Sequence, residues 1–236
     1  MILTLIIGFF LGLSIPVTAS RFGKVLPADP GMVIATLWHK PRFPKTNNPE
    51  RQKQLMNKWK KMAYFSFGWS IVMATLFGAS YLLFPTDMFY FACAFFYIVG
   101  MLMAVDHQYY LLPDFFTIPL MLLGLTSAFY VETPNLSFEA KLVGAWFGYA
   151  LSTISVLLMY FFKKCEFGAG DVKMLTAFGA WFGAFALNIA VVLSFVFFAI
   201  TVMIKKKRAD AFGPALGLAG IIVFFLVYLN LLFTFM

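Results

Sequence analysis

The composition of the chain excludes an ordinary soluble domain. Its 236 residues are 62% hydrophobic and only 12% charged, whereas soluble domains are about 45–50% apolar and about 25% charged. The formal net charge is +8, but the basic residues cluster between apolar stretches, which is the pattern that membrane orientation produces. No basic groove interleaved with aromatic residues is visible, so we expect no nucleic-acid binding.

The first apolar stretch, Ile2–Ala19, predicts a retained transmembrane helix. A cleaved signal peptide would carry basic residues before its apolar core, and here they begin only afterwards, at Arg21. The following segment, Ser20–Lys61, holds ten basic residues and two acidic ones. The positive-inside rule predicts that this segment is cytoplasmic.

The rest of the chain alternates between apolar stretches and short charged connections. The stretch Val172–Ile204 is long for one span, and a hairpin of two short spans with its turn near Gly183–Asn188 keeps Lys205–Arg208 on the basic side. In this topology seventeen of the eighteen basic residues share one side, with Lys141 as the exception. The other expected spans are Ala63–Phe84, Met88–Val105, Phe115–Val131, Leu142–Phe162 and Ala215–Phe235.

These patterns together predict an all-α fold, a polytopic membrane helical bundle of about eight transmembrane helices. We expect one membrane domain over residues 1–236. Residues 1–62 would form the first span and a basic cytoplasmic loop, and residues 63–236 the helical core that carries the chemistry.

Two carboxylates at span ends are the strongest chemical signal. Asp106 ends a span that runs inward and Asp171 begins one that runs outward, so both are expected at the inner face. An ionisable group at the edge of the apolar region is costly and therefore indicates function. Two carboxylates held together at low dielectric tend to share a proton, giving a general acid and a general base around one water. Aspartic proteolysis requires this arrangement.

The residues before Asp171 allow two interpretations. Gly168 and Gly170 could let an extended substrate backbone pass close to the carboxylate, because glycine has no Cβ. The alternative is a glycine-rich helix start in which Asp171 caps the helix. Gly-x-Gly-Asp is too short a pattern to decide between them.

A longer motif lies around the first aspartate. The segment Asp106–Leu120 reads Asp-x6-Pro-Asp-x2-Thr-x-Pro-Leu, with Pro113 and Asp114 at its centre, and the segment Gly168–Lys173 reads Gly-x-Gly-Asp-x-Lys. In this order the two motifs resemble those of the prepilin peptidases, the membrane leader peptidases of type IV pili and type II secretion. Two further stretches are similar to this family, and the resemblance covers residues 98–220. These stretches are Ala180–Gly183 and Phe212–Ala215.

The resemblance implies a membrane aspartic endopeptidase of the bacterial inner membrane, with its active site at the cytoplasmic face. Its partners would be the lipid bilayer and prepilin or pseudopilin peptides, whose short basic leader it would cut after a glycine and before a hydrophobic residue. Asp106 and Asp171 would be the catalytic pair. The residues implied to support the site are Gly168, Gly170, Lys173, Pro113 and Asp114.

The first inner loop departs from the family. Many members carry two CxxC pairs there as a zinc-binding module, but Ser20–Lys61 contains no cysteine, so no metal is expected. The peptidase reaction implies no cofactor. Members often also methylate the new N-terminus with S-adenosylmethionine, an activity associated with the N-terminal half, and the departure leaves that activity open for this chain.

Several alternatives stay open at this point. His107 could tune Asp106 or lie at the membrane interface, and Asp114 could assist catalysis or cap a helix that starts at Phe115. Lys173 could pair with a carboxylate or anchor the span. The whole chain could instead be a proton-coupled transporter that uses the two aspartates, although transporter sites lie near the midplane. A non-enzymatic membrane assembly protein would need no paired carboxylates.

Overall fold

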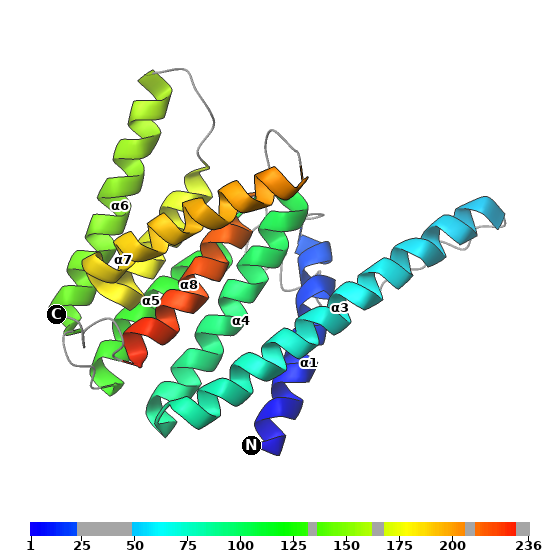
Figure 1. Cartoon of the computed structure of the whole chain (residues 1–236), viewed down its shortest axis with the longest axis horizontal. Coiled ribbons are helices and arrows are strands. Elements are labelled where there is room, and N and C mark those ends of the chain that lie inside the picture. Colours follow the sequence, from blue (N-terminus) through cyan, green and yellow to red (C-terminus); the bar gives the residue numbers. More distant parts are fainter. Residues whose placement is uncertain (23–48, 132–135, 162–167, 206–210, 230–236) are drawn as a thin grey trace. The chain divides into compact units, whose positions relative to one another are not determined.

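A computed structural model describes residues 1–22, 49–131, 136–161, 168–205 and 211–229 of the chain. These residues form seven helices and no strand, so the predicted all-α fold is confirmed. The helices carry the labels of Figure 1. They are α1 (Ile2–Phe22), α3 (Pro49–Leu83), α4 (Thr86–Tyr109), α5 (Asp114–Tyr130), α6 (Phe138–Phe161), α7 (Ala169–Lys205) and α8 (Gly213–Tyr228).

The protein is a multi-pass membrane protein. Among the helices that the structure describes, five are long and apolar enough to cross a bilayer, namely α1, α3, α4, α6 and α7. The helices α5 and α8 are also apolar but have only 17 and 16 residues, fewer than the roughly 20 that a perpendicular span needs. The expected count of eight spans is therefore not confirmed.

The chain divides into two compact units, Met1–Leu82 and Leu83–Met236. In the first unit, α1 and α3 approach each other at Gly8 and Gly12. A Cβ on Gly8 would lie 2.8 Å from the carbonyl oxygen of Met73. Small residues four positions apart allow such close helix contact in a membrane. The predicted single membrane domain, with residues 1–62 as its first part and residues 63–236 as its helical core, stays a prediction.

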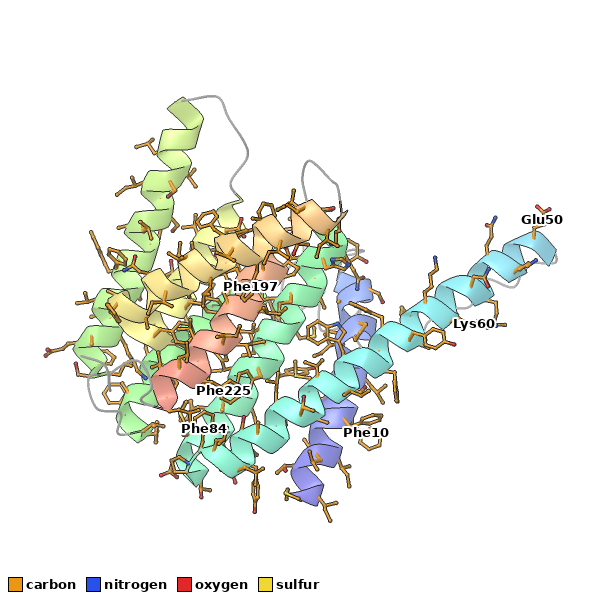
Figure 2. All side chains as sticks on the ribbon, viewed as in Figure 1. Phe10, Glu50, Lys60, Phe84, Phe197 and Phe225 are labelled. Atoms are coloured by element: carbon orange, nitrogen blue, oxygen red, sulfur yellow. The ribbon has the colours of Figure 1, made fainter. Side chains whose placement is uncertain are left out.

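The start of α3 lies within the segment that was expected to be a basic loop. Residues 23–48 of that segment are outside the described residues, whereas its remainder from Pro49 onward is helical. Figure 2 shows nitrogen-bearing side chains gathered on α3 between Glu50 and Lys60. The apolar part of α3 begins at Lys60, so the same helix carries both the basic stretch and the span.

In the second unit, α8 packs between α4 and α7 (Figure 1). Phenylalanine rings fill this contact, as at Phe95 and Phe224, whose ring centroids are 4.6 Å apart. Phe84 and Phe225 stack nearby with centroids 5.7 Å apart (Figure 2). Such aromatic pairs stabilise a core by about 0.5–1.5 kcal/mol each beyond the burial of their area.

The predicted break in the long apolar stretch is confirmed at Gly183. This residue has φ 73° and ψ 174° in the middle of α7, a conformation that glycine adopts at little cost. Figure 1 shows the yellow first segment of α7 meeting its orange second segment at a sharp bend. Leu175 and Val191, eight residues before and after Gly183, line the same cavity, so the chain folds back on itself. Asn188, expected at the turn, lies in the second segment and its Nδ2 donates to the carbonyl oxygen of Ala184 at 2.9 Å.

Two copies of the sequence Gly-Ala-Trp-Phe-Gly bring α6 and α7 into backbone contact. The copies begin at Gly144 and at Gly179, and a Cβ on either glycine would overlap the backbone of the other helix. A Cβ on Gly148 would lie 2.6 Å from the carbonyl oxygen of Leu175. The contact therefore holds the first segment of α7, which carries Asp171, directly against α6.

Lys141, the one basic residue expected on the outer side of the membrane, is completely buried near the start of α6. Its Nζ donates to Ser127 Oγ at 2.5 Å, to the Gly124 carbonyl oxygen at 3.3 Å and to the Tyr228 hydroxyl at 3.4 Å. The Tyr228 hydroxyl in turn donates to the carbonyl oxygen of Trp181 at 3.1 Å. No carboxylate in the described part of the chain pairs with Lys141. The amine thus links α5, α6 and α8 by hydrogen bonds to uncharged groups.

We expect Lys141→Ala to destabilise the protein by about 2–4 kcal/mol, because it removes these hydrogen bonds and leaves a void. Lys141→Met keeps most of the volume and buries no amine, so it should cost less than half as much. Thermal unfolding in detergent, followed by circular dichroism, measures both. Lys60→Ala, on an exposed side chain of α3, is the control. Equal stability of Lys141→Ala and the wild type would contradict this role for the amine.

Candidate active site

Asp106 lies near the end of α4 and only 6% of it is exposed. Its Oδ2 accepts a hydrogen bond of 2.8 Å from the backbone N–H of Gly213, the first residue of α8. Backbone N–H groups at a helix N-terminus are suited to hold an anion, because they lack partners within the helix and lie at its positive end. The carboxylate of Asp106 is therefore fixed in orientation by a residue 107 positions later in the chain.

Asp171 lies in the first turn of α7 and is half-buried. Its backbone N–H donates to the carbonyl oxygen of Gly168 at 3.0 Å, which closes a turn before the helix. The carboxyl groups of Asp171 and Asp106 interact electrostatically. The structure thus brings together the two acidic residues that were predicted to form a pair.

The two glycines before Asp171 lie against the α4–α5 loop. A Cβ on Gly170 would be 2.7 Å from Leu112 Cβ and 3.3 Å from its backbone nitrogen, and a Cβ on Gly168 would be 3.3 Å from Asp171 Oδ2. The absence of side chains therefore allows two segments of this chain to meet beside the carboxylates. Passage of an extended substrate over the same glycines stays a prediction.

Tyr110 turns the chain beyond Asp106. It is the one non-glycine residue in the described part of the chain with a positive φ, at φ 57° and ψ 38°. Its N–H donates to the carbonyl oxygen of Asp106 at 2.9 Å, ending α4 in a left-handed cap. The turn leads through Leu112, which lies over the start of α7, to Pro113, the N-cap residue of α5.

Asp114 and Lys173 join the two motifs by an ion pair of 2.5 Å, with about half of each side chain exposed. Asp114 is the first residue of α5 and follows the N-cap residue Pro113, so the alternative in which Asp114 caps this helix is wrong. Lys173 lies two residues after Asp171. Of the two roles left open for Lys173, the structure shows the pairing with a carboxylate. The partner is Asp114, outside the predicted catalytic pair. His107, next to Asp106, is exposed.

The contribution of Gly213 was not foreseen from the sequence. The signal in the sequence is the stretch Phe212–Ala215, which is similar to the prepilin peptidases but by itself suggests no role for Gly213. The site also has no group of three or more His, Cys, Asp or Glu side chains that could hold a metal ion, as far as the described residues extend. What the site offers chemically is two neighbouring carboxyl groups, one buried and held by a backbone N–H, the other half-buried.

The residues around this pair match a known family. Residues 93–203 match the model of the type IV leader peptidase family. This part of the chain is similar to that family. The leader peptidase segment includes Asp106, Asp114, Asp171 and Lys173, whereas Gly213 lies beyond its end.

The chain is also similar to individual proteins that are named leader peptidases. The chain is 35% identical over 123 residues to the prepilin leader peptidase/N-methyltransferase of Neisseria gonorrhoeae, which covers 50% of this chain and 42% of that protein. The protein of the same name from Dichelobacter nodosus is 32% identical over 139 residues, 57% of this chain and 48% of the relative. The chain spans about half the length of the curated relatives it matches. No solved structure matches it.

The ion pair between Asp114 and Lys173 should contribute moderately to the rate of the reaction at this site. We expect Lys173→Glu to lower the rate of the reaction at this site about two- to fivefold, because an exposed ion pair is worth up to about 1 kcal/mol and the like charges would push the start of α7 away from the α4–α5 loop. The double variant Asp114→Lys/Lys173→Glu restores opposite charges and should recover most of the rate. Initial cleavage rates on one substrate measure this, with Lys60→Glu as the charge control. A double variant no better than Lys173→Glu would contradict a positioning role for the pair.

Proposed function

We propose that this protein is a membrane aspartic endopeptidase that removes the short leader of type IV prepilins or pseudopilins. The observation that carries the proposal is the electrostatic interaction between Asp106 and Asp171, which come from two separate motifs and are both at least partly buried. The names of the relatives, which are prepilin leader peptidases, support the choice of substrate.

The proposed reaction needs one water between the two carboxyl groups. The ionised carboxylate takes a proton from the water as it attacks the carbonyl carbon of the bond to be cut, and the protonated carboxyl gives its proton to the carbonyl oxygen. When the tetrahedral intermediate collapses, the C–N bond breaks and the leaving amine receives a proton from the pair. The Gly213 N–H keeps Asp106 in one orientation throughout.

We place the protein in the bacterial inner membrane with the site at the cytoplasmic face. This follows from the distribution of basic residues between the apolar helices. Reporter fusions at Asn47 and Lys164 should report the cytoplasm, and a fusion at Asn135 the outer side; all three positions are outside the described residues. A cytoplasmic signal at Asn135 would contradict the proposed orientation.

The proposed peptidase reaction uses no cofactor. Methylation of the new N-terminus with S-adenosylmethionine is a separate activity. The names of the relatives include an N-methyltransferase beside the peptidase. The family resemblance associates it with the N-terminal half, in which residues 23–48 are outside the described residues. One assay can follow both activities, but cleavage and methylation each need a separate readout.

The test is incubation of the purified full chain in detergent with a full-length prepilin, read by mass spectrometry. Cleavage after the leader glycine is expected in the absence of S-adenosylmethionine. With that compound added, one extra methyl group on the new N-terminus would establish the second activity. An intact prepilin after incubation with protein of native helix content, in several detergents and in lipid nanodiscs, would overturn the proposed function.

A further inference from the structure

A cavity of about 200 Å³ lies between α6, the two segments of α7 and the residue that precedes α8. Its walls are mainly apolar, including Leu175, Phe195 and Phe212, and none of its lining residues carries a charge. Three serines also line it, two from α6 and one from the second segment of α7. They are Ser152, Ser155 and Ser194.

The three serines do not make the cavity polar. Each hydroxyl donates to a carbonyl oxygen of its own helix: Ser152 to Gly148 at 2.6 Å, Ser155 to Leu151 at 2.8 Å, and Ser194 to Val191 at 2.7 Å. Their donors are thus satisfied and need no ligand. An apolar cavity of about 150 Å³ can enclose a benzene molecule, so this one has room for one large aliphatic or aromatic side chain.

The position of the cavity relates it to both aspartates. Leu175 follows Asp171 by four residues in α7, and residues four apart lie on the same side of a helix, with their Cβ atoms about 5–6 Å apart. Phe212 directly precedes Gly213, whose N–H holds Asp106. The cavity therefore begins one helical turn from one carboxylate and one residue from the donor that orients the other.

We propose that this cavity receives one large apolar side chain of the substrate, on the side of the cut bond opposite the leader, and thereby selects the substrate. This rests on the proposed function. The uncharged lining would leave a basic leader side chain without a partner, at a high desolvation cost, so the basic side chains of the leader are excluded. The volume suits one bulky residue, and a small residue there would leave most of the cavity empty.

The test compares matched prepilins with Phe or Ala directly after the cut bond. The wild type should cleave the Phe substrate with at least tenfold higher kcat/KM, the scale on which an apolar pocket discriminates between side chains that differ by several carbon atoms. Ser194→Leu and Ser155→Leu fill the cavity from two different helices, α7 and α6. Each should lower the Phe/Ala ratio of kcat/KM at least tenfold while changing cleavage of the Ala substrate less than threefold.

Thr201→Leu is the matched control. Thr201 lies in the same segment of α7 as Ser194, its hydroxyl likewise donates to its own helix, to the Phe197 carbonyl oxygen at 2.7 Å, and it is not part of the cavity lining. Its Phe/Ala ratio should equal that of the wild type. Thermal unfolding of every variant checks the fold, and Ser155→Leu, at a less buried position than Ser194, decides if Ser194→Leu does not fold.

The outcomes separate the two proposals. An unchanged Phe/Ala ratio in the filled variants, or an equal loss of both substrates, would overturn the pocket and leave the peptidase standing; a lipid acyl chain as the true occupant would give this result. A wild type that cleaves neither substrate overturns the proposed function and the pocket with it.

Discussion

Asp106→Asn and Asp171→Asn are each expected to lower the rate of prepilin cleavage about 10⁴-fold or more, and the double variant no further. The reason is that one water has to be deprotonated by one carboxyl group while the other protonates the carbonyl oxygen. Either group without the other performs neither step, so the effects of removing them are not additive. Single-turnover cleavage rates of the three variants on one prepilin measure this directly.

The asparagine variants should keep the fold. Asparagine has the shape of aspartate, and its carbonyl oxygen can still accept the hydrogen bond from Gly213. Asp87→Asn is the matched control, since Asp87 lies in the first turn of α4, the helix that carries Asp106 near its other end. It should cleave at the wild-type rate. If Asp171→Asn kept more than a few per cent of the activity, the pair would be wrong and Asp114 would become the rival partner for Asp106.

Gly213→Ala is expected to lower kcat about 100-fold, because a misplacement of about 1 Å in a catalytic group can cost that much. A Cβ on Gly213 would lie 2.6 Å from Asp106 Oδ2 and 2.8 Å from its Cγ. Asp106 is only 6% exposed, so its carboxylate has little room to retreat. The substitution keeps the N–H but displaces the group that accepts from it.

Gly217→Ala is the control for Gly213→Ala. Gly217 lies one turn later in α8 and also faces α4, but a Cβ there meets the flexible side chain of Met103 instead of a carboxylate. We expect a comparable loss of thermal stability in both variants and a large loss of kcat only in Gly213→Ala. Wild-type activity in Gly213→Ala would mean that the observed orientation of Asp106 is not needed for catalysis.

Much of the architecture could be predicted from local patterns. Hydropathy depends on the residues of one stretch, so it indicated a membrane protein made of helices before any contact was known. The length of Val172–Ile204 and the charges after it predicted the break that the structure has at Gly183. The spacing of two motifs identified Asp106 and Asp171, which the structure places in one site. The expected count of eight crossings is not confirmed, because α5 has 17 residues and α8, within the described part of the chain, has 16.

The partners of individual side chains depend on which helix faces meet, and only the tertiary structure decided those. Trp146 and Trp181 occupy the same place in two identical Gly-Ala-Trp-Phe-Gly sequences, yet Trp146 is 74% exposed and Trp181 is fully buried. Lys141 lies in the core because Ser127 and Tyr228, from two other helices, supply hydrogen-bond acceptors there. The Gly213 donor to Asp106 arises in the same way, from packing of the start of α8 against the end of α4. Hydropathy and motif spacing report what each segment prefers, whereas a hydrogen bond across 107 positions exists only after the helices have packed.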